Sequence, residues 1–276
     1  MADAYIVVLD VAADAVRVLL FDSEARRVEG YAAQLPRRAE AAADCLDEMH
    51  RLVQAADFLV AAVVGTAEIT AEDRRLWPAF EGASWFPALP SGAAMMLGCG
   101  CIDRERVALV MGEAGMVGTV VESPLEVDGL SCVAIDEKRW MLSGPVAEAG
   151  LAYRSLKHSI RGSVEKYLAN AAAGDPALAG LDAAIRGFRE VYFRLAGHGP
   201  APQVIGCGEA LLKAPSLAQR IADGTGVCLT LSTEIEPASR GAALWALERV
   251  GVIGDLRALP ASTGPEFTPV FLETTK

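Results

Sequence analysis

The first residue that could do chemistry is Asp10, which follows the apolar run YIVVL at residues 5–9. An acidic side chain that ends a buried strand before a tight turn is typical of a metal or phosphate site. Turns that hold phosphate are usually built from Gly, Ser and Thr, because backbone N–H groups and hydroxyls must converge on the anion. Here the turn reads Val11-Ala12-Ala13-Asp14-Ala15. It keeps the carboxylate and has no hydroxyl.

The elements that must position this turn occur twice along the chain. β-Branched runs predict strands at residues 5–10, 16–21 and 28–34 in the first half, and at 107–111, 116–121, 130–135 and 140–142 in the second. Each set is followed by amphipathic helices and short strands, with helices at 39–55, 181–195, 210–224 and 238–250 and strands at 58–64, 203–205 and 227–231. We therefore predict an α/β protein with two tandem domains, each a mixed β-sheet flanked by helices, around a cleft.

The repeat also predicts the domain limits. We expect an N-terminal domain at residues 1–103, a C-terminal domain at 104–255, and a Pro- and Thr-containing tail at 256–276 that is loosely held.

Five stretches, in this order, resemble motifs of one protein family. They are LDVAADAVRVLLFD (9–22), PSGAAMMLGCG (90–100), VALVMGEAG (107–115), GEALLKAPSLAQRIAD (208–223) and EPASRGAALWAL (236–247). Together they resemble the FGGY family of carbohydrate kinases, most closely its gluconate-kinase-like members, within the actin-like (ribonuclease H-like) ATPase superfamily. The resemblance extends over most of the chain.

The resemblance implies ATP and Mg²⁺ as cofactors and a role for each matched residue. Asp10 matches the carboxylate that holds the metal, and Ser91 stands where the family has the Asp that takes the proton from the sugar hydroxyl. The nucleotide-binding positions are Ala13, Asp14, Gly112, Glu113, Gly115, Gly208 and Glu209. In the closing helix, Arg240 is expected to tie the helix down rather than to touch substrate.

The chain departs from the family pattern in several places. It is roughly half the usual length, and the part that normally supplies most sugar contacts is missing before residue 90. The hydroxyl of Ser91 is no general base near neutral pH. Three loops have also gained an acid, at Asp14, Glu113 and Glu209. Two unit charges about 4 Å apart repel by about 4 kcal/mol at an effective dielectric near 20, unless the side chains extend into solvent.

Two functions remain open at this point. In the first, the chain is a catalytically degenerate member of the family that binds a ligand or a partner in the retained cleft. In the second, it is a working ATP-dependent sugar or sugar-acid kinase whose missing parts come from a homodimer mate or a partner protein. A filament-forming, actin-like structural protein is a third and weaker alternative, since fold alone does not fix function.

Composition limits the classes of binding partner and the cellular compartment that we expect for this protein. The formal net charge of -11 argues against nucleic acid and anionic membranes as partners. The longest strongly apolar run, residues 58–64, is far too short to span a bilayer. The six cysteines form no CxxC pair, so we expect reduced thiols and no zinc site, with Cys99 and Cys101 as small residues of the core. No leader for export is apparent, and we expect a cytoplasmic protein.

Overall fold

The computed structural model describes residues 4–12, 14–38, 40–65, 73–112, 114–160, 162–171, 175–197 and 202–270. The chain separates into two compact units: Met1–Gly98 with Ala238–Leu259, and Cys99–Pro237 with Pro260–Lys276. The closing helix therefore groups with the first unit, whereas the sequence placed it in the C-terminal domain. The domain limits themselves stay a prediction.

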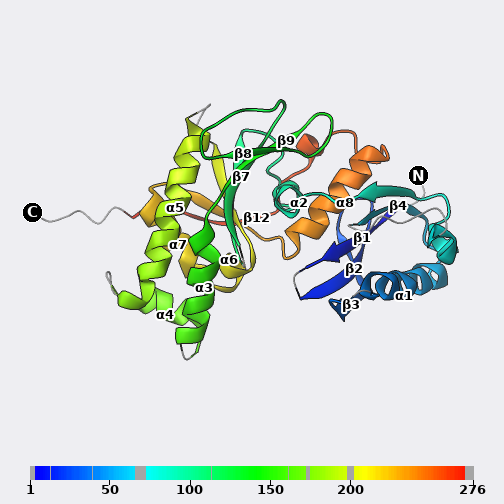
Figure 1. The fold of residues 1–276 in the computed structure, drawn as a ribbon, viewed down its shortest axis with the longest axis horizontal. Coiled ribbons are helices and arrows are strands. Elements are labelled where there is room, and N and C mark those ends of the chain that lie inside the picture. Colours follow the sequence, from blue (N-terminus) through cyan, green and yellow to red (C-terminus); the bar gives the residue numbers. More distant parts are fainter. Residues whose placement is uncertain are drawn as a thin grey trace, which may run out of the picture. The chain divides into compact units, whose positions relative to one another are not determined.

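The first unit is built on a five-stranded mixed sheet in the order β3-β2-β1-β4-β5. Its elements are β1 (Tyr5–Val11), β2 (Ala15–Phe21), β3 (Arg27–Pro36), α1 (Ala41–Ala55), β4 (Val60–Gly65), β5 (Ser84–Pro87), α2 (Ser91–Gly98) and α8 (Pro237–Arg249), with short 3₁₀ turns at Asp73–Leu76, Pro78–Phe80 and Leu256–Ala258. Figure 1 shows α1 along one side of β1, β2 and β3, and α8 along the other.

Alternation along the strands decides which helix each side chain meets. Val7 and Leu9 of β1 pack in one apolar cluster with Met49 of α1. On β5, Trp85 belongs to that same cluster, whereas the next residue, Phe86, stacks edge-on against Trp245 of α8 at 5.3 Å between ring centroids. Successive strand residues point to opposite faces, so this sheet has an α1 face and an α8 face.

The helix α8 approaches α2 closely because residue 241 is a glycine. A Cβ built on Gly241 would lie 1.8 Å from the carbonyl oxygen of Ala94. Beside it, Arg240 donates from Nη1 to the carbonyl oxygen of Gly98, at 2.6 Å, and so caps the end of α2. The expectation that Arg240 ties the closing helix down is confirmed.

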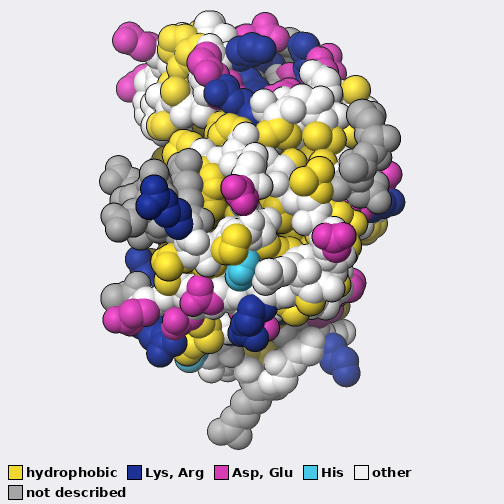
Figure 2. All heavy atoms as spheres, turned by 90° about the vertical axis from the view of Figure 1, so that its right-hand side faces the viewer, with side chains coloured by type: hydrophobic (Ala, Val, Ile, Leu, Met, Phe, Trp, Pro, Cys, Tyr) yellow, Lys and Arg dark blue, Asp and Glu magenta, His cyan; other side chains and the backbone are white. Residues whose placement is uncertain are grey.

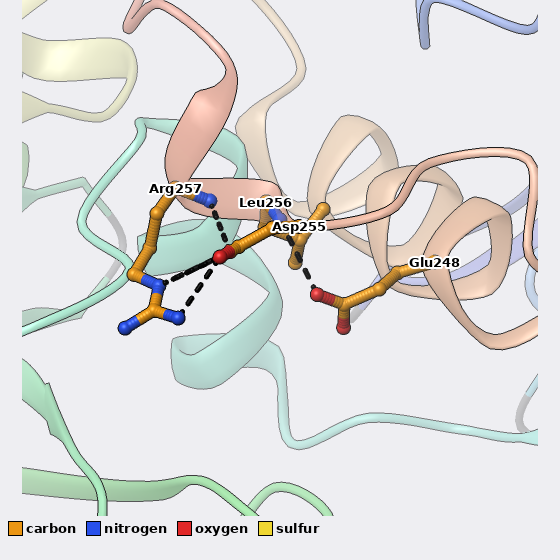
Figure 3. A network of polar contacts seen from close by, with 4 residues as sticks. All are labelled: Glu248, Asp255, Leu256 and Arg257. Atoms are coloured by element: carbon orange, nitrogen blue, oxygen red, sulfur yellow. Dashed lines mark hydrogen bonds and ion pairs between the residues drawn. The ribbon is translucent and has the colours of Figure 1, made fainter.

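The segment after α8 is tied back to that helix. The backbone N–H of Leu256 donates to Oε1 of Glu248 at 3.3 Å, as Figure 3 shows. In the same turn, both carboxylate oxygens of Asp255 accept from the guanidinium of Arg257. The chain therefore stays on the first unit until residue 259.

The second unit is built on a seven-stranded mixed sheet in the order β12-β11-β10-β6-β7-β9-β8. Its strands are β6 (Arg106–Met111), β7 (Gly115–Val121), β8 (Ser131–Ala134), β9 (Trp140–Pro145), β10 (Gln203–Cys207), β11 (Leu229–Ser232) and β12 (Thr263–Phe267). Its helices are α3 (Ala147–Ser159), α4 (Val164–Asn170), α5 (Ala179–Ala196), α6 (Glu209–Lys213) and α7 (Ser216–Thr225), with a 3₁₀ turn at Pro176–Leu178. Figure 1 shows α3, α4, α5 and α7 gathered on one side of this sheet.

The predicted fold class is confirmed, since two mixed sheets are flanked by helices. Two local predictions are wrong. The helix expected at 210–224 is broken into α6 and α7, because Pro215 lacks the N–H that would continue it. Within the tail expected from residue 256, Thr263–Phe267 is not loosely held, because this strand, β12, pairs antiparallel with β11 at the edge of the second sheet.

Cys99 and Cys101 pack in the core as the sequence predicts, whereas Cys132 is half-buried and Cys228 is exposed. Cys45, Cys99, Cys101 and Cys207 are buried, and burial raises the pKa of the Cys101 thiol well above its ordinary value. No helix within the described ranges combines the length and apolarity needed to cross a bilayer. Figure 2 shows hydrophobic side chains interspersed with acidic and basic ones on the face it views.

The glycine at the crossing of α8 and α2 gives a stability prediction. Changing Gly241 to Ala should lower the free energy of unfolding by about 2 kcal/mol: overpacking costs about 3 kcal/mol, and alanine returns about 1 kcal/mol within a helix. Urea unfolding followed by tryptophan fluorescence measures the change. Gly254→Ala is the matched control, because no atom lies within 4 Å of its added Cβ. Equal stability of the two variants would contradict the close approach.

Candidate functional site

The hairpin of β1 and β2 fixes what surrounds Asp10. The backbone N–H of Ala12 donates to the carbonyl oxygen of Ala15 at 2.9 Å and closes a tight turn. From there the antiparallel register places Asp10 directly opposite Arg17. Side chains of residues directly opposite in such a pair lie on one face and interact. Asp10 therefore has a cation as its cross-strand neighbour.

The carboxylate of Asp10 is bonded to two other elements of the first unit. Its Oδ2 accepts from Nη2 of Arg17 in an ion pair, and it also accepts from the hydroxyl of Ser239 on α8 at 3.3 Å. The side chains of Asp10 and Arg17 are 21% and 29% exposed, so the pair is only partly screened by water. Sequence reasoning missed Arg17 and Ser239. Counting across the four-residue turn would have found Arg17.

A small pocket opens beside this carboxylate. Asp10, Ser91, Ala94, Ser239 and Ala242 line it together with neighbouring residues of β1, β4 and the segment after β5. The structure thus brings together two predicted site residues, Asp10 and Ser91, which lies exposed at the start of α2. The pocket measures about 80 Å³. Pockets that enclose small organic ligands are several times larger.

The residues around Asp10 do not fit a Mg²⁺ site. A divalent ion about 4 Å from one carboxylate gains about 8 kcal/mol at an effective dielectric near 20, and a guanidinium at that distance cancels this gain. Mg²⁺ keeps several water ligands and is usually held by only one or two protein carboxylates together with phosphates, so the charge on Arg17 decides whether Asp10 can bind it. Within the described part of the chain, no group of three or more His, Cys, Asp or Glu side chains could hold a metal ion.

The other predicted residues of the first turn contribute little charge to a site. Asp14 is exposed, so water screens its carboxylate, and its backbone oxygen accepts from the N–H of Arg37 at 3.1 Å. Ala13 of this turn and Glu113 of the second turn lie outside the described residues. The repulsion that the sequence predicts for Asp14 is therefore small.

In the second unit, the glycines of the predicted nucleotide loops have packing roles. A Cβ on Gly115 would lie 2.3 Å from the Cβ of Ala149 on α3. Gly208 has φ +108°, and a Cβ there would lie 2.5 Å from the carbonyl oxygen of Met111. Only glycine fits such positions. Their presence is explained by the packing of β7 on α3 and of β10 beside β6, with no need for a ligand.

The second turn and the Gly208 turn lie side by side. Strands β6 and β10 are parallel neighbours, so their carboxyl ends meet at one edge of the sheet. A Cβ on Gly112 would lie 3.9 Å from the backbone nitrogen of Glu209. The N–H of Gly112 donates to the carbonyl oxygen of Ala114 at 3.1 Å. That donor closes the hairpin, as the N–H of Ala12 does in the first unit.

The charge of Glu209 is offset by two lysines that sequence reasoning missed. Its Oε1 accepts from Nζ of Lys213, one helical turn later, at 2.6 Å, and lies 4.0 Å from Nζ of Lys157 on α3. The hydrogen bond from Lys213 holds the pKa of the Glu209 carboxyl below its ordinary value. Lys213 was detectable as an i, i+4 partner, whereas Lys157 depends on α3, which the sequence pattern did not predict.

Comparison with known proteins places the fold. No family model matches the chain. A stretch of 74 residues is 27% identical to gluconokinase of Bacillus subtilis (strain 168), covering 26% of this chain and 14% of that protein. Among solved structures, the chain is similar to gluconate kinase from Lactobacillus acidophilus, with TM-score 0.70, 14% identity, and 98% and 94% of the two chains covered. Plasmodium falciparum glycerol kinase with ADP gives TM-score 0.70, 8% identity, and 97% and 94% coverage.

A ligand-bound xylulose kinase from Lactobacillus acidophilus gives TM-score 0.69 at 14% identity, with 97% and 94% of the two chains covered. Identities this low carry the fold alone. The two-domain actin-like fold of the FGGY carbohydrate kinases is the fold of this chain, and the resemblance predicted from the five motifs is confirmed at that level.

The ion pair on Glu209 gives a prediction about pH. Changing Lys213 to Met removes the hydrogen-bond donor, so the pKa of the Glu209 carboxyl should rise. In the unchanged protein this pKa lies below its unfolded value, so the pair stabilises the fold above the unfolded pKa and loses that effect as the pH falls through the folded pKa. Carboxyl carbon NMR titration measures both variants. Lys166→Met, an exposed lysine on α4, should leave the pKa of Glu209 unchanged.

Proposed function

We propose that this chain is a carbohydrate-kinase-like protein that has lost phosphoryl transfer and acts by binding a ligand or a partner. The observation that carries the proposal is the ion pair between Asp10 and Arg17. In a kinase of this fold, the carboxylate at this position would hold Mg²⁺ against the phosphates. Here a guanidinium of the chain itself neutralises that carboxylate.

The remaining parts of the catalytic machinery support the same proposal. Ser91 is at the position of the base, and its hydroxyl cannot take a proton near neutral pH. The first turn, from Ala12 to Ala15, has no hydroxyl, and one of its N–H groups is used within the hairpin. Phosphoryl transfer depends on positioning and on neutralising the phosphate charge, and both are missing at this turn.

The ligand of the proposed function is a sugar or sugar acid. Support comes from the similar structures, which are described as gluconate, xylulose and glycerol kinases. Binding in a cleft between the two domains, a homodimer or a partner protein, and a cytoplasmic location stay predictions from the sequence.

An active ATP-dependent sugar or sugar-acid kinase remains the second candidate, and one observation favours it. Two of the three acids would repel phosphate only weakly. Water screens the charge of exposed Asp14, and lysines pair with Glu209. The similar glycerol kinase structure holds ADP. In an active enzyme, ATP would be the donor, and Arg17 would have to release Asp10 before a metal could bind.

Turnover separates the two candidates. We expect no release of ADP above background from Mg-ATP with gluconate, D-xylulose or glycerol, because Arg17 neutralises Asp10 and the hydroxyl of Ser91 cannot act as the base near neutral pH. A coupled ADP-release assay on protein free of contaminating kinases measures this. ADP release that depends on the sugar and disappears in Asp10→Asn would establish the active kinase instead.

The role of Arg17 is tested by metal binding. Changing Arg17 to Gln removes the cation that neutralises Asp10, so we expect Mn²⁺ to bind to this variant and not to the unchanged protein. Electron paramagnetic resonance of free Mn²⁺ measures the binding. The control is the double variant Arg17→Gln, Asp10→Asn, which should bind none. Mn²⁺ binding to the unchanged protein, lost in Asp10→Asn, would refute the proposed role of Arg17.

A further inference from the structure

A larger pocket lies in the first unit, apart from Asp10. It measures about 390 Å³ and is lined by Arg75, Pro78, Phe80, Glu81, Gly82, Ala83 and Trp85. That volume is within the range of sites for small organic ligands. We call it the Trp85 pocket.

The Trp85 pocket and the Asp10 pocket lie at opposite ends of β5. Gly82 and Ala83 precede this strand and line the Trp85 pocket, whereas Leu89 and Ser91 follow the strand and line the Asp10 pocket. The two pockets also belong to different faces of the sheet. Trp85 is on the α1 face, and the Asp10 pocket is lined by residues of α8. A ligand in the Trp85 pocket would therefore not touch Asp10.

The aromatic wall of the Trp85 pocket is held in place by its neighbours. The ring of Trp85 lies 6.1 Å from that of buried Phe80 and 6.2 Å from that of Trp77. Trp77 in turn donates from Nε1 to Asp47 of α1 at 2.7 Å. Nearby, the backbone N–H of Ala79 donates to Nδ1 of His50 at 3.3 Å. A wall fixed by packing and hydrogen bonds loses little conformational entropy when a ligand binds.

Two opposite charges complete the lining. Arg75 and Glu81 are exposed, and neither side chain has a hydrogen bond or ion pair with another of the described residues. Arg presents five N–H donors, and a carboxylate presents about four acceptor sites. Together they add no net charge, so the pocket does not select an anion or a cation. A ligand that bonds to both Arg75 and Glu81 must carry acceptors for the guanidinium and donors for the carboxylate. It must also lose its own water at little cost in free energy.

We propose that the Trp85 pocket binds a neutral monosaccharide, with one C–H face of the sugar ring against Trp85 and its hydroxyls bonded to Arg75 and Glu81. Each hydroxyl both donates and accepts, so neighbouring hydroxyls serve the guanidinium and the carboxylate together. A zwitterionic amino acid also has no net charge, but it must desolvate two full charges to enter. The inference goes beyond the proposed function, because this site is separate from Asp10.

The indole N–H signals of the four tryptophans provide the readout. In ¹⁵N-labelled full-length protein without ATP, D-xylose or D-glucose should shift the Trp85 signal, assigned with Trp85→Phe. The Kd should be on the order of millimolar, as expected for a ligand of about twelve heavy atoms in an open site. Glu81→Gln and Arg75→Gln should each weaken binding by about tenfold, as the loss of a hydrogen bond to a charged group does.

Matched controls are Glu126→Gln and Arg186→Gln, two exposed residues of the second unit that should leave the Kd unchanged. No shift of the Trp85 signal at about 50 mM sugar, well above a millimolar Kd, would overturn the proposal. Tighter binding of gluconate or L-phenylalanine would overturn the neutral-sugar assignment. The Asp10→Asn variant should bind the sugar with the same Kd as the unchanged protein. Sugar-dependent ADP release by the unchanged protein would refute the proposed function but would not bear on sugar binding in the Trp85 pocket.

Discussion

The carboxylate of Asp10 joins three elements of the first unit. It accepts from Arg17 on β2 and from Ser239 on α8, although 229 residues separate the latter pair in the chain. A buried or half-buried carboxylate must find such partners, because leaving it unpaired costs several kcal/mol. In a metal-dependent site the ion would be the main partner. In this chain the described partners of the acid are the side chains of Arg17 and Ser239, so the acid links β1 to β2 and α8.

Three glycines of the motif stretches also have a role in packing. Gly115, Gly208 and Gly241 all stand where a Cβ would meet another atom at 2.5 Å or less, a contact that backbone and short side chains cannot relieve. Each lies in a stretch that resembles the kinase motifs. These glycines are therefore required by the close approach of strands and helices whether or not a nucleotide binds.

Much of the fold was predictable because its strands are strongly patterned. The hairpins and the long helices α1, α5 and α8 have a clear period, so they were found at nearly the observed limits. The α2 and α3 helices and strand β5 lack such a period, and the pairing of β12 with β11 is decided by tertiary contacts. For the site, Arg17 was missed although strand register would have found it, whereas Ser239 and Lys157 depend on how distant helices pack.

The structure also changes the reason for expecting lost catalysis. From the sequence, repulsion between three acids and phosphate was the main argument. Exposure of Asp14 and the lysines beside Glu209 weaken that argument, since screened and paired charges repel little. Three features remain: the neutralised carboxylate of Asp10, the lack of hydroxyls in the first turn, and Ser91 of α2 at the position predicted for the base. The proposed loss of phosphoryl transfer therefore rests on positioning rather than on repulsion, because catalysis depends on holding the phosphates in line and this turn offers no hydroxyl for that.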